Sequence, residues 1–416
     1  MSNFILHLDM NSYFASVEQQ ANSFLRGKPV GVCAYLAPRG CIIASSKEAK
    51  KLGIKVGCTV EKAKQIYPKI ILVENEPAKY RSTTKKIFNI LSDYTDRIEP
   101  YSIDEAFLDM TGHIKNWQQG EKIILEIKAR IKKEVGEWLA CSAGLSWTRF
   151  LAKFASDICE KDSYLLIDSI AKMEDIFNRV KITEAWGIKE RMQVHLNRLG
   201  IFNLLDLKNF PVANIMQALG KPGYYLWANA NGVEVQGIRT QEEILPKSIG
   251  HSYCMPRHTT DLKYLAGILM KLSEKTGRRL RIQGLEARGI YAGYWLKYGG
   301  GFFKSKKVPS ALFTTEEIFK AAQNLLFKTL PPRAVTMLAV SVTQLQPLTN
   351  QLDLFYSLDK KRFACQAMDK INDKFGEYTI FNGTMWGLGD QAHDRIGFRK
   401  SVEIMDKLDR FSYEPI

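Results

Sequence analysis

Three acidic residues that lie far apart in the chain could act together: Asp9, Asp104 and Glu105. Asp9 ends the apolar run Phe4-Ile5-Leu6-His7-Leu8, and the other two lie in the segment 102–109. If both segments are neighbouring strands, Asp9 and Asp104 meet at one sheet edge, where two close carboxylates both stay ionised only with a cation between them. Oxygen ligands of this kind favour Mg²⁺. Two such ions could activate a hydroxyl and neutralise a triphosphate, which is the chemistry of phosphoryl transfer.

The alternation of side chains along a strand distinguishes Asp104 from Glu105 as a metal ligand. Successive strand residues point to opposite faces, so Asp104 and Glu105 can both bind metal only if the strand bends there. We therefore place Glu105 behind Asp104 as a ligand. The competing interpretation is a solvated turn at residues 102–105 and an Asp9 that caps a strand, and the spacing alone does not decide between the two.

The residues after Asp9 indicate a strand that runs into a helix. The N-terminus of a helix offers unpaired N–H groups to an anion, so a triphosphate could rest there while Asp9 holds its metal. Phe14 would then stand beside the sugar. The alternative is that Tyr13 and Phe14 are core aromatics of the first helical turn.

An α+β sheet packed on two helices is the expected frame for these residues. Continuous apolar runs predict its strands and apolar residues at helical spacing predict its helices. The expected strands cover residues 4–8, 98–110 (strand, bend, strand) and 139–145, and the expected helices cover residues 80–94 and 123–135.

The rest of the chain reads as further subdomains. An insertion in the sheet contains a strand at 29–32 and a helix near 46–52. A helical unit with Gly and Pro punctuation follows from about residue 168, and residues 233–246 read as a linker. A separate α+β domain is then expected, with helices at 262–283 and 315–326 and strands at 289–296 and 334–342.

Length and composition exclude several classes of protein. The 416 residues, 45% of them apolar, are enough for about two to four globular domains. The seven cysteines are scattered and lack zinc-ligand spacing, as expected of reduced thiols in a cytosolic protein. The chain contains no apolar run long enough to cross a membrane and no basic leader, so we expect it to be neither secreted nor inserted into a membrane.

The basic charge is concentrated in one part of the chain. The net charge is +15, and residues 247–348 carry 16 Lys and Arg against 5 Asp and Glu, a surplus of 11. The tail from residue 349 has 10 basic and 11 acidic residues, a net charge of −1. The charge pattern therefore predicts that one domain binds a polyanion, although charge alone does not separate nucleic acid from a membrane surface.

Three motifs in this order resemble the Y-family translesion DNA polymerases. They are D-M-N-S-Y-F-A-S-V-E from Asp9, A-S-S-K-E-A-K-K-L-G-I-K-V-G from Ala44 and Y-S-I-D-E-A-F-L-D from Tyr101. Three ordered motifs are far more specific than one. The likeness covers nearly the whole chain and is closest to the bacterial branches, polymerase IV and the UmuC subunit of polymerase V.

This resemblance implies a multidomain α+β, right-hand polymerase. The implied parts are a ferredoxin-like palm (1–10 and 79–168), small fingers (11–78), an all-α thumb with a helix-hairpin-helix (169–236), a linker (237–246), a basic α+β little finger (247–348) and a C-terminal tail (349–416).

The resemblance also assigns the active site. Asp9, Asp104 and Glu105 become the catalytic carboxylates for two Mg²⁺ ions, with the Met10 carbonyl on the second ion. Phe14 becomes the steric gate that would collide with a ribose 2′-OH. The implied nucleotide-binding residues are Asn11, Tyr13, Phe14, Lys47, Lys50 and Lys161.

Several of these positions depart from the family pattern. Lys47 and Lys50 stand where many relatives have Tyr and Arg, so the planar fork of the arginine and the tyrosine hydroxyl are lost. Asn11 replaces an aspartate common in polymerase IV. Lys161 is displaced by about one position from the usual Lys-Pro-Asn-Gly, and a lone lysine in a charged cluster is usually a solvated residue.

The resemblance implies two sets of DNA contacts, both sequence-independent and salt-sensitive. Gly187, Lys189 and Gly200 mark the helix-hairpin-helix, although Lys189 replaces a usual glycine and an ordinary helix turn competes. The basic domain contributes Lys247, Arg278, Arg279, Arg281, Arg288, Lys304, Lys306 and Lys307.

A short segment after the basic domain resembles the sliding-clamp-binding pentapeptide of bacteria. It comprises Gln351, Leu352, Asp353, Leu354 and Phe355. The glutamine would make polar contacts, and Leu354 and Phe355 would enter an apolar cleft. Part of the 61 residues that follow is expected to be ordered, with a helix end near 368–376.

Together these features predict a Mg²⁺-dependent, DNA-templated DNA polymerase of the translesion type, without proofreading, that joins a deoxynucleotide to a primer 3′-OH. Its expected partners are primer-template DNA, the nucleotide, the sliding clamp and accessory subunits of an SOS-type complex, in the cytoplasm at the nucleoid. One alternative is a non-catalytic, polymerase-like accessory subunit that binds DNA and the clamp. A second, a palm-type nucleotidyl cyclase, predicts neither a basic domain nor a clamp motif.

Overall fold

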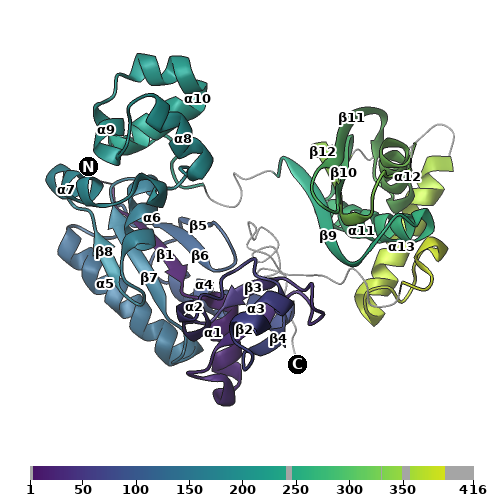
Figure 1. Ribbon diagram of the computed structural model, residues 1–416, viewed down its shortest axis with the longest axis horizontal. Helices are drawn as coiled ribbons and strands as arrows, with labels where there is room; N and C mark the ends of the chain where they lie inside the picture. The colour runs from purple at the N-terminus through teal and green to yellow at the C-terminus, as the bar shows by residue number, and fades with distance from the viewer. Residues whose placement is uncertain (1–2, 240–245, 329, 349–356, 389–416) are drawn as a thin grey trace. The chain divides into compact units, whose positions relative to one another are not determined.

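The computed structural model describes residues 3–239, 246–328, 330–348 and 357–388 (Figure 1). Contacts between residues divide the chain into two compact units, the first running to residue 244 and the second starting at residue 245. Each unit is described below by itself.

A five-stranded sheet organises the first unit. Its strands lie in the order β5 (Ile98–Pro100), β6 (Glu105–Asp109), β1 (Ile5–Met10), β7 (Cys141–Ser146) and β8 (Tyr164–Leu166). The central strand β1 pairs antiparallel with β6 and with β7, and β7 pairs parallel with β8. The predicted order of strand, helix, hairpin, helix and strand is confirmed, and the sheet is the α+β frame expected for Asp9.

The two faces of this sheet differ because side chains alternate along β1. Leu6, Leu8 and Met10 join a large core with helices α4 (Pro77–Ser92) and α5 (Trp117–Arg130). On the opposite face, Ile5 packs with Phe107 and with Ala152 of helix α6 (Arg149–Ile158). The alternation therefore places His7 and Asp9 on the side of α6.

Both predicted helices of this frame start earlier than their apolar pattern indicated. Helix α4 begins with Pro77, a residue that favours the first helical position. Helix α5 begins after Asn116, whose side chain accepts a hydrogen bond from the Gln119 backbone N–H. These first turns carry few apolar residues, so the periodicity did not reveal them. Residues 131–135, predicted as the end of α5, form a π-helical turn, η2 (Ile131–Val135).

A smaller three-stranded sheet is inserted between β1 and α4. Its strands lie in the order β3 (Ile42–Ser45), β2 (Val30–Cys33) and β4 (Ile71–Glu74). The helices of this region are α1 (Tyr13–Ala21), η1 (Ser23–Leu25), α2 (Lys47–Lys51) and α3 (Val60–Ile66). The insertion has its own small apolar core around Ile42 and Ile54, and the strand and helix predicted within it correspond to β2 and α2.

A helical subdomain completes the first unit. It contains α7 (Ile170–Arg179), η3 (Ile182–Glu184), α8 (Glu190–Arg198), α9 (Leu204–Asn209) and α10 (Val212–Ala230). Helix α10 is kinked at Gly220, which has a φ of 63°. Phe150 and Phe154 of α6 belong to the core of this subdomain. Helix α6 therefore joins the helical subdomain to the five-stranded sheet.

A four-stranded antiparallel sheet organises the second unit. Its strands lie in the order β11 (Gly301–Leu312), β10 (Leu285–Leu296), β12 (Val335–Pro347) and β9 (Ser248–Thr259). Its helices are α11 (Leu262–Ile282), α12 (Thr315–Leu326), α13 (Ser357–Phe375) and η5 (Gly383–Met385). The two predicted helices correspond to α11 and α12. The two predicted strands lie within β10 and β12, apart from Ala334, the residue before β12.

The sequence patterns missed two strands of this unit, β9 and β11. Strand β11 is an edge strand with exposed, lysine-rich residues along most of its length, so it lacks the apolar alternation of a half-buried strand. The tail also packs on this unit, because Met385 and Leu388 belong to its core.

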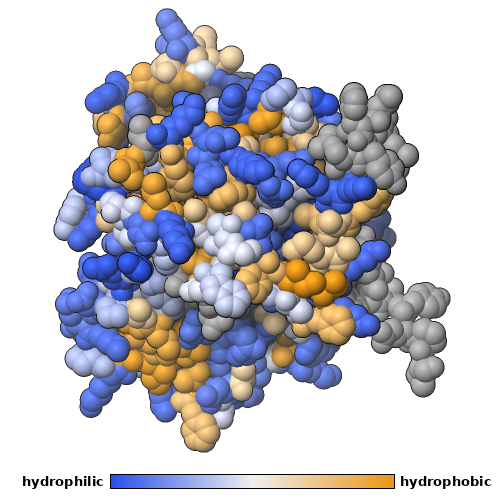
Figure 2. Space-filling model, turned by 90° about the vertical axis from the view of Figure 1, so that its right-hand side faces the viewer, coloured by the Kyte–Doolittle hydropathy of each residue, from blue (hydrophilic) through white to orange (hydrophobic). Residues whose placement is uncertain are grey.

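Polar side chains cover much of the face seen in the space-filling view, with apolar side chains in separate patches (Figure 2). Among the described residues, no helix combines the length and the apolar character needed to cross a membrane.

Candidate active site

Asp9 and Asp104 are brought together by the pairing of β1 with β6. Asp9 lies opposite Glu105 in this pairing, and the Met10 backbone N–H donates to the Asp104 carbonyl at 2.8 Å. Asp104 is the residue before β6, at the end of a bend that includes Ser102, whose hydroxyl donates to the Asp104 carboxylate. The bend required for Asp104 and Glu105 to serve one site is therefore present.

Burial raises the pKa values of the two aspartates, although the nearby charge of Lys153 opposes the rise. Burial, and next the negative charge of Asp104, raise the pKa of Asp9 to about 7. Burial likewise raises the pKa of Asp104 to about 6, although the Ser102 hydrogen bond opposes this rise. Both carboxylates would be stabilised by a nearby cation.

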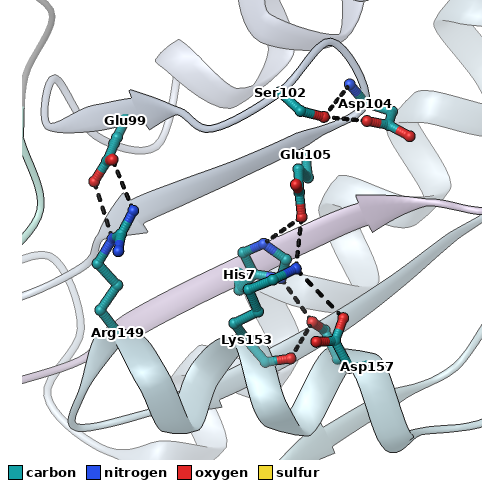
Figure 3. A network of polar contacts seen from close by, with 9 residues as sticks. His7, Glu99, Ser102, Asp104, Glu105, Arg149, Lys153 and Asp157 are labelled. Carbon is teal, nitrogen blue, oxygen red and sulfur yellow. Dashed lines mark hydrogen bonds and ion pairs between the residues drawn. The ribbon is translucent and has the colours of Figure 1, made fainter. Parts of the chain in front are cut away.

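Glu105 points away from Asp104 and toward helix α6 (Figure 3). Its Oε2 accepts a hydrogen bond from Lys153 Nζ at 2.7 Å and lies 3.3 Å from His7 Nε2, without hydrogen-bond geometry in the second case. Burial acts to raise the pKa of Glu105, but His7 and Lys153 outweigh burial and bring it to about 2. Glu105 is thus an ionised carboxylate with a cationic partner from the protein.

His7 connects this carboxylate to helix α6. Its Nδ1 lies 2.6 Å from Ser156 Oγ, and Ser156 Oγ itself donates to the Lys153 carbonyl at 2.8 Å. Because the Ser156 hydroxyl already donates its proton to the Lys153 carbonyl, His7 Nδ1 is the donor in its bond to Ser156 Oγ. Burial lowers the pKa of His7, which is fully enclosed and lies 4.4 Å from the Phe107 ring.

A buried ion pair fixes the start of α6 beside this network. Arg149 binds both carboxylate oxygens of Glu99 at 2.8 and 3.0 Å, and its guanidinium lies 4.2 Å from the Phe107 ring centre (Figure 3). The Arg149 backbone N–H donates to Glu234 at 2.7 Å. Helix α6 is thus anchored near the carboxylates through both its side chains and its backbone.

The carboxylates fit a divalent cation in part. Asp9 and Asp104 supply oxygen ligands with raised pKa values. Glu105 Oε2 is bonded to Lys153. Among the described residues, no three His, Cys, Asp or Glu side chains form a ready metal cluster.

Lys50 and Lys161 interact electrostatically, whereas Lys47 lies over a tryptophan ring. Lys50 Nζ lies 2.7 Å from the Ser12 hydroxyl, and burial and next the charge of Lys161 lower the pKa of Lys50. Lys161 is exposed. Lys47 instead lies 5.2 Å from the Trp138 ring centre.

The remaining predicted nucleotide contacts differ from expectation. Tyr13 is a core residue, whose hydroxyl lies 2.9 Å from the Tyr80 carbonyl and 2.7 Å from Thr84 Oγ1, as the alternative interpretation of this residue expected. Phe14 is also buried, with 0% of its surface exposed, and stacks on Tyr80 with the ring centres 4.6 Å apart. Asn11 binds two other residues of the protein, Ser142 and Asp162.

The predicted helix-hairpin-helix residues lie at the two ends of α8. Gly187 precedes this helix with a φ of 92°, and Gly200 follows it with a φ of 80°. Both values favour glycine. Lys189 is the N-cap residue of α8 and is exposed.

The basic residues of the second unit fall into two groups. Lys304, Lys306 and Lys307 are exposed on β11, and Lys247 and Arg288 are exposed as well. Arg279 is partly buried beside the Gly250 carbonyl.

Two arginines lie against the tail and not on the open surface. Arg281 is 4% exposed and binds both oxygens of Asp369 at 2.5 and 2.9 Å. Arg278 pairs with Asp373 and, at 3.6 Å, with Glu377. We therefore withdraw Arg278 and Arg281 from the predicted DNA contacts, because helix α13 and the residues after it neutralise them. The pattern of residues 247–348 could not reveal partners that lie in the tail.

The clamp-like segment with Gln351, Leu352, Leu354 and Phe355 lies outside the described residues. The expected helix end near 368–376 corresponds to the end of α13 at Phe375.

The sequence analysis missed His7 and Lys153, which make the contacts of Glu105. A signal for His7 was available, since it lies two positions before Asp9 and therefore on the same strand face. Lys153 could not be assigned without knowing that α6 crosses this face.

Two family models match the chain, the impB/mucB/samB family over residues 8–157 and its C-terminal domain over residues 246–354. Among curated relatives, DNA polymerase IV of Pelotomaculum thermopropionicum is 32% identical over 90% of this chain and 94% of its own length. DNA polymerase IV 2 of Bacillus subtilis is 30% identical over 94% of this chain and 96% of its own length.

Solved structures give the same result. A Y-family DNA polymerase chimera of Dbh and Dpo4 matches 83% of this chain and 99% of its own with a TM-score of 0.75 and 26% identity. An insertion ternary complex of Dbh DNA polymerase matches 82% of this chain and 98% of its own with a TM-score of 0.56 and 26% identity.

Proposed function

Because the chain belongs to the impB/mucB/samB family, as a Y-family DNA polymerase of the polymerase IV type, we propose that Asp9 and Asp104 carry its chemistry. The enzyme is a translesion, DNA-directed DNA polymerase that uses a divalent metal, and its substrates are DNA and deoxynucleoside triphosphates. Our proposal concerns the residues, the ions and the further partners.

One observation carries the assignment of residues: two partly buried carboxylates from distant segments converge at the β1–β6 pairing, and burial raises the pKa of both. We propose Mg²⁺ as the ion, two per site, held by Asp9, Asp104, Glu105 and the Met10 carbonyl. When bound, the ions would lower the pKa of the primer 3′-OH and neutralise the triphosphate.

The protein groups around the carboxylates would position them for this reaction. Lys153 donates a hydrogen bond to Glu105 Oε2, so this side chain keeps one orientation beside Asp9. Ser102 fixes the Asp104 carboxylate through a hydrogen bond. Lys50 and Lys161 would bind the triphosphate, and Phe14 would exclude a 2′-OH. We also propose that the enzyme lacks proofreading.

The subdomains take the roles that the family implies. We propose that the five-stranded sheet is the palm and that the inserted sheet is the fingers. The helical subdomain would be the thumb, and the second unit the little finger. Gly187, Lys189, Gly200, Lys247, Arg279, Arg288 and the β11 lysines would contact DNA phosphates.

Further partners belong to the same proposal. We propose that residues 351–355 bind the sliding clamp and that accessory subunits of an SOS-type complex join the enzyme. Its place of action would be the bacterial cytoplasm, at the nucleoid, where its DNA substrate lies.

Primer extension tests the assignment of the aspartates. With Mg²⁺, the rate of primer extension by Asp104→Ala should fall by at least about 100-fold. The variant lacks one of the carboxylates proposed to hold the ions that stabilise the negative charge of the transition state. Asp96→Ala, at an exposed aspartate, is the matched control and should extend normally. Full extension by folded Asp104→Ala would contradict the assignment and would revive the accessory-subunit alternative for this site.

A further inference from the structure

Asn11 uses both ends of its amide to join two segments of the protein. Its Nδ2 donates to Ser142 Oγ at 3.0 Å, and its Oδ1 accepts from the Asp162 backbone N–H at 2.7 Å. The backbone N–H identifies the amide end that faces it as the oxygen. Asn11 thus connects the end of strand β1 to the turn at residues 160–163, about 150 positions later in the chain.

This turn has an unfavourable backbone that its neighbours stabilise. Asp162 has a φ of 58°, in the left-handed region that non-glycine residues seldom adopt. The Ser163 N–H donates to the Glu160 carbonyl and closes the turn. Two lysines bind the Asp162 carboxylate, Lys128 at 2.9 Å and Lys132 at 2.6 Å.

Lys161 lies in this turn, one residue before the N–H that Asn11 binds. Its charge acts on Lys50, whose ammonium group binds the hydroxyl of Ser12. Ser12 is also left-handed, with a φ of 51°, and it directly follows Asn11. Asn11 therefore binds one left-handed residue, Asp162, and directly precedes the other, Ser12, to which Lys50 donates.

From this geometry we propose that Asn11 is a positioning residue that holds the 160–163 turn so that Lys161 faces the triphosphate together with Lys50. The inference rests on the proposed role of Lys161 and refines the expectation for Asn11. The Asn11 amide acts on the nucleotide indirectly, by holding the turn, and does not contact the nucleotide itself.

Asn11→Ala is the first test. Without the amide, the turn loses a hydrogen bond worth about 1 kcal/mol, so the dNTP KM should rise about five- to tenfold. The value of kcat should stay within about twofold, because the bond lost acts on binding in the ground state and transition state alike. A rise in KM is a result that a merely structural role would not produce at unchanged Tm.

The conservative variant Asn11→Asp should keep most of the function. A carboxylate still accepts from the Asp162 N–H, and the Ser142 hydroxyl can donate to it in place of its present 3.4 Å bond to the Glu160 carbonyl. The dNTP KM of Asn11→Asp should therefore lie well below that of Asn11→Ala. Equal KM values for these two variants would contradict the proposal, because Asn11→Ala cannot make the bond to the turn.

A double-mutant cycle separates this inference from the proposed function. If Asn11 acts through Lys161, the variant with both Asn11→Ala and Lys161→Ala should bind dNTP no more weakly than Lys161→Ala alone. Additive effects would overturn the role of Asn11. If Lys161→Ala leaves KM unchanged, the assignment of Lys161 itself fails, which is a different outcome.

Asp162→Gly provides a background that tests whether Asn11 acts by holding the left-handed turn. Glycine adopts positive φ without strain and keeps the backbone N–H that Asn11 binds. In an Asp162→Gly background, the added Asn11→Ala change should raise KM less than it does in the native chain. An undiminished effect would show that Asn11 does not act by holding the left-handed turn.

Discussion

Asp9 and Asp104 show at the residue scale that the carboxylates proposed as the active site destabilise the folded protein at neutral pH. Both carboxylates are partly buried, and this burial, together with the negative charge of neighbouring carboxylates, makes each of them harder to ionise. The folded protein therefore holds protons on these groups that the unfolded chain releases at lower pH.

The pH dependence of stability follows from these raised pKa values. As pH rises from about 4 toward 8, the two aspartates lower the free energy of unfolding, because the folded state binds more protons than the unfolded state. Without metal, Asp104→Asn should therefore have a higher Tm than the native chain at pH 8, and a smaller advantage at pH 5. Thermal unfolding in a chelator measures this, and an advantage independent of pH would contradict it.

Phe14 is the second residue whose role can be tested. Because the ring is buried, replacing it by alanine costs about 3–5 kcal/mol of stability, so Phe14→Leu should be measured beside Phe14→Ala. If Phe14 is the gate, a smaller side chain should raise the ratio of kcat/KM for ribonucleotides over deoxynucleotides by at least about tenfold. An unchanged ratio in the folded variants would assign the gate to another side chain.

Helix α6 is the element that decides the site. It packs on the sheet face that bears Asp9 and supplies Lys153 and Ser156 to the Glu105 network. The close approach of this helix to β7 depends on Gly144, where a Cβ would lie 2.1 Å from the Ala152 carbonyl oxygen.

Gly144→Ala should therefore push α6 away from the sheet. We expect a loss of about 1–3 kcal/mol in the free energy of unfolding, because neither backbone can yield without repacking. Gly237→Ala is the control, since a Cβ there meets no atom within 4 Å, and it should change stability by less than about 0.5 kcal/mol. Chemical denaturation compares the two, and equal stability would show that α6 adapts easily.

At the scale of the whole molecule, the positive charge divides between a surface and an internal interface. Lys304, Lys306 and Lys307 are exposed on β11, whereas the tail neutralises Arg278 and Arg281. A count of basic residues in the sequence therefore exceeds the number free to contact a polyanion.

The salt dependence of DNA binding distinguishes basic residues that contact phosphate from those that are neutralised within the protein. Replacing the three β11 lysines by alanine should reduce the slope of log K against log salt by about 2–3, since each phosphate contact contributes nearly one. Arg281→Ala should leave the slope unchanged and lower the Tm, because Asp369 loses its partner. Fluorescence anisotropy over a salt series decides, and a slope that falls equally in both proteins would return Arg281 to the DNA contacts.

The sequence by itself determined the elements with strong periodicity and the chemistry of the site. The apolar run that ends at Asp9, helix α12 and the three ordered motifs are all local properties of the chain. They were enough to predict the α+β frame and the convergence of two carboxylates.

Only the tertiary structure decided which charges are paired. Glu105 pairs with Lys153, Arg281 pairs with Asp369, and the turn that contains Lys161 is hydrogen-bonded to Asn11. These partners are 48, 88 and 151 positions apart in the chain. The free energy of such a pair depends on distance and burial, which arise only when the sheets and helices pack, so no local pattern of residues encodes it.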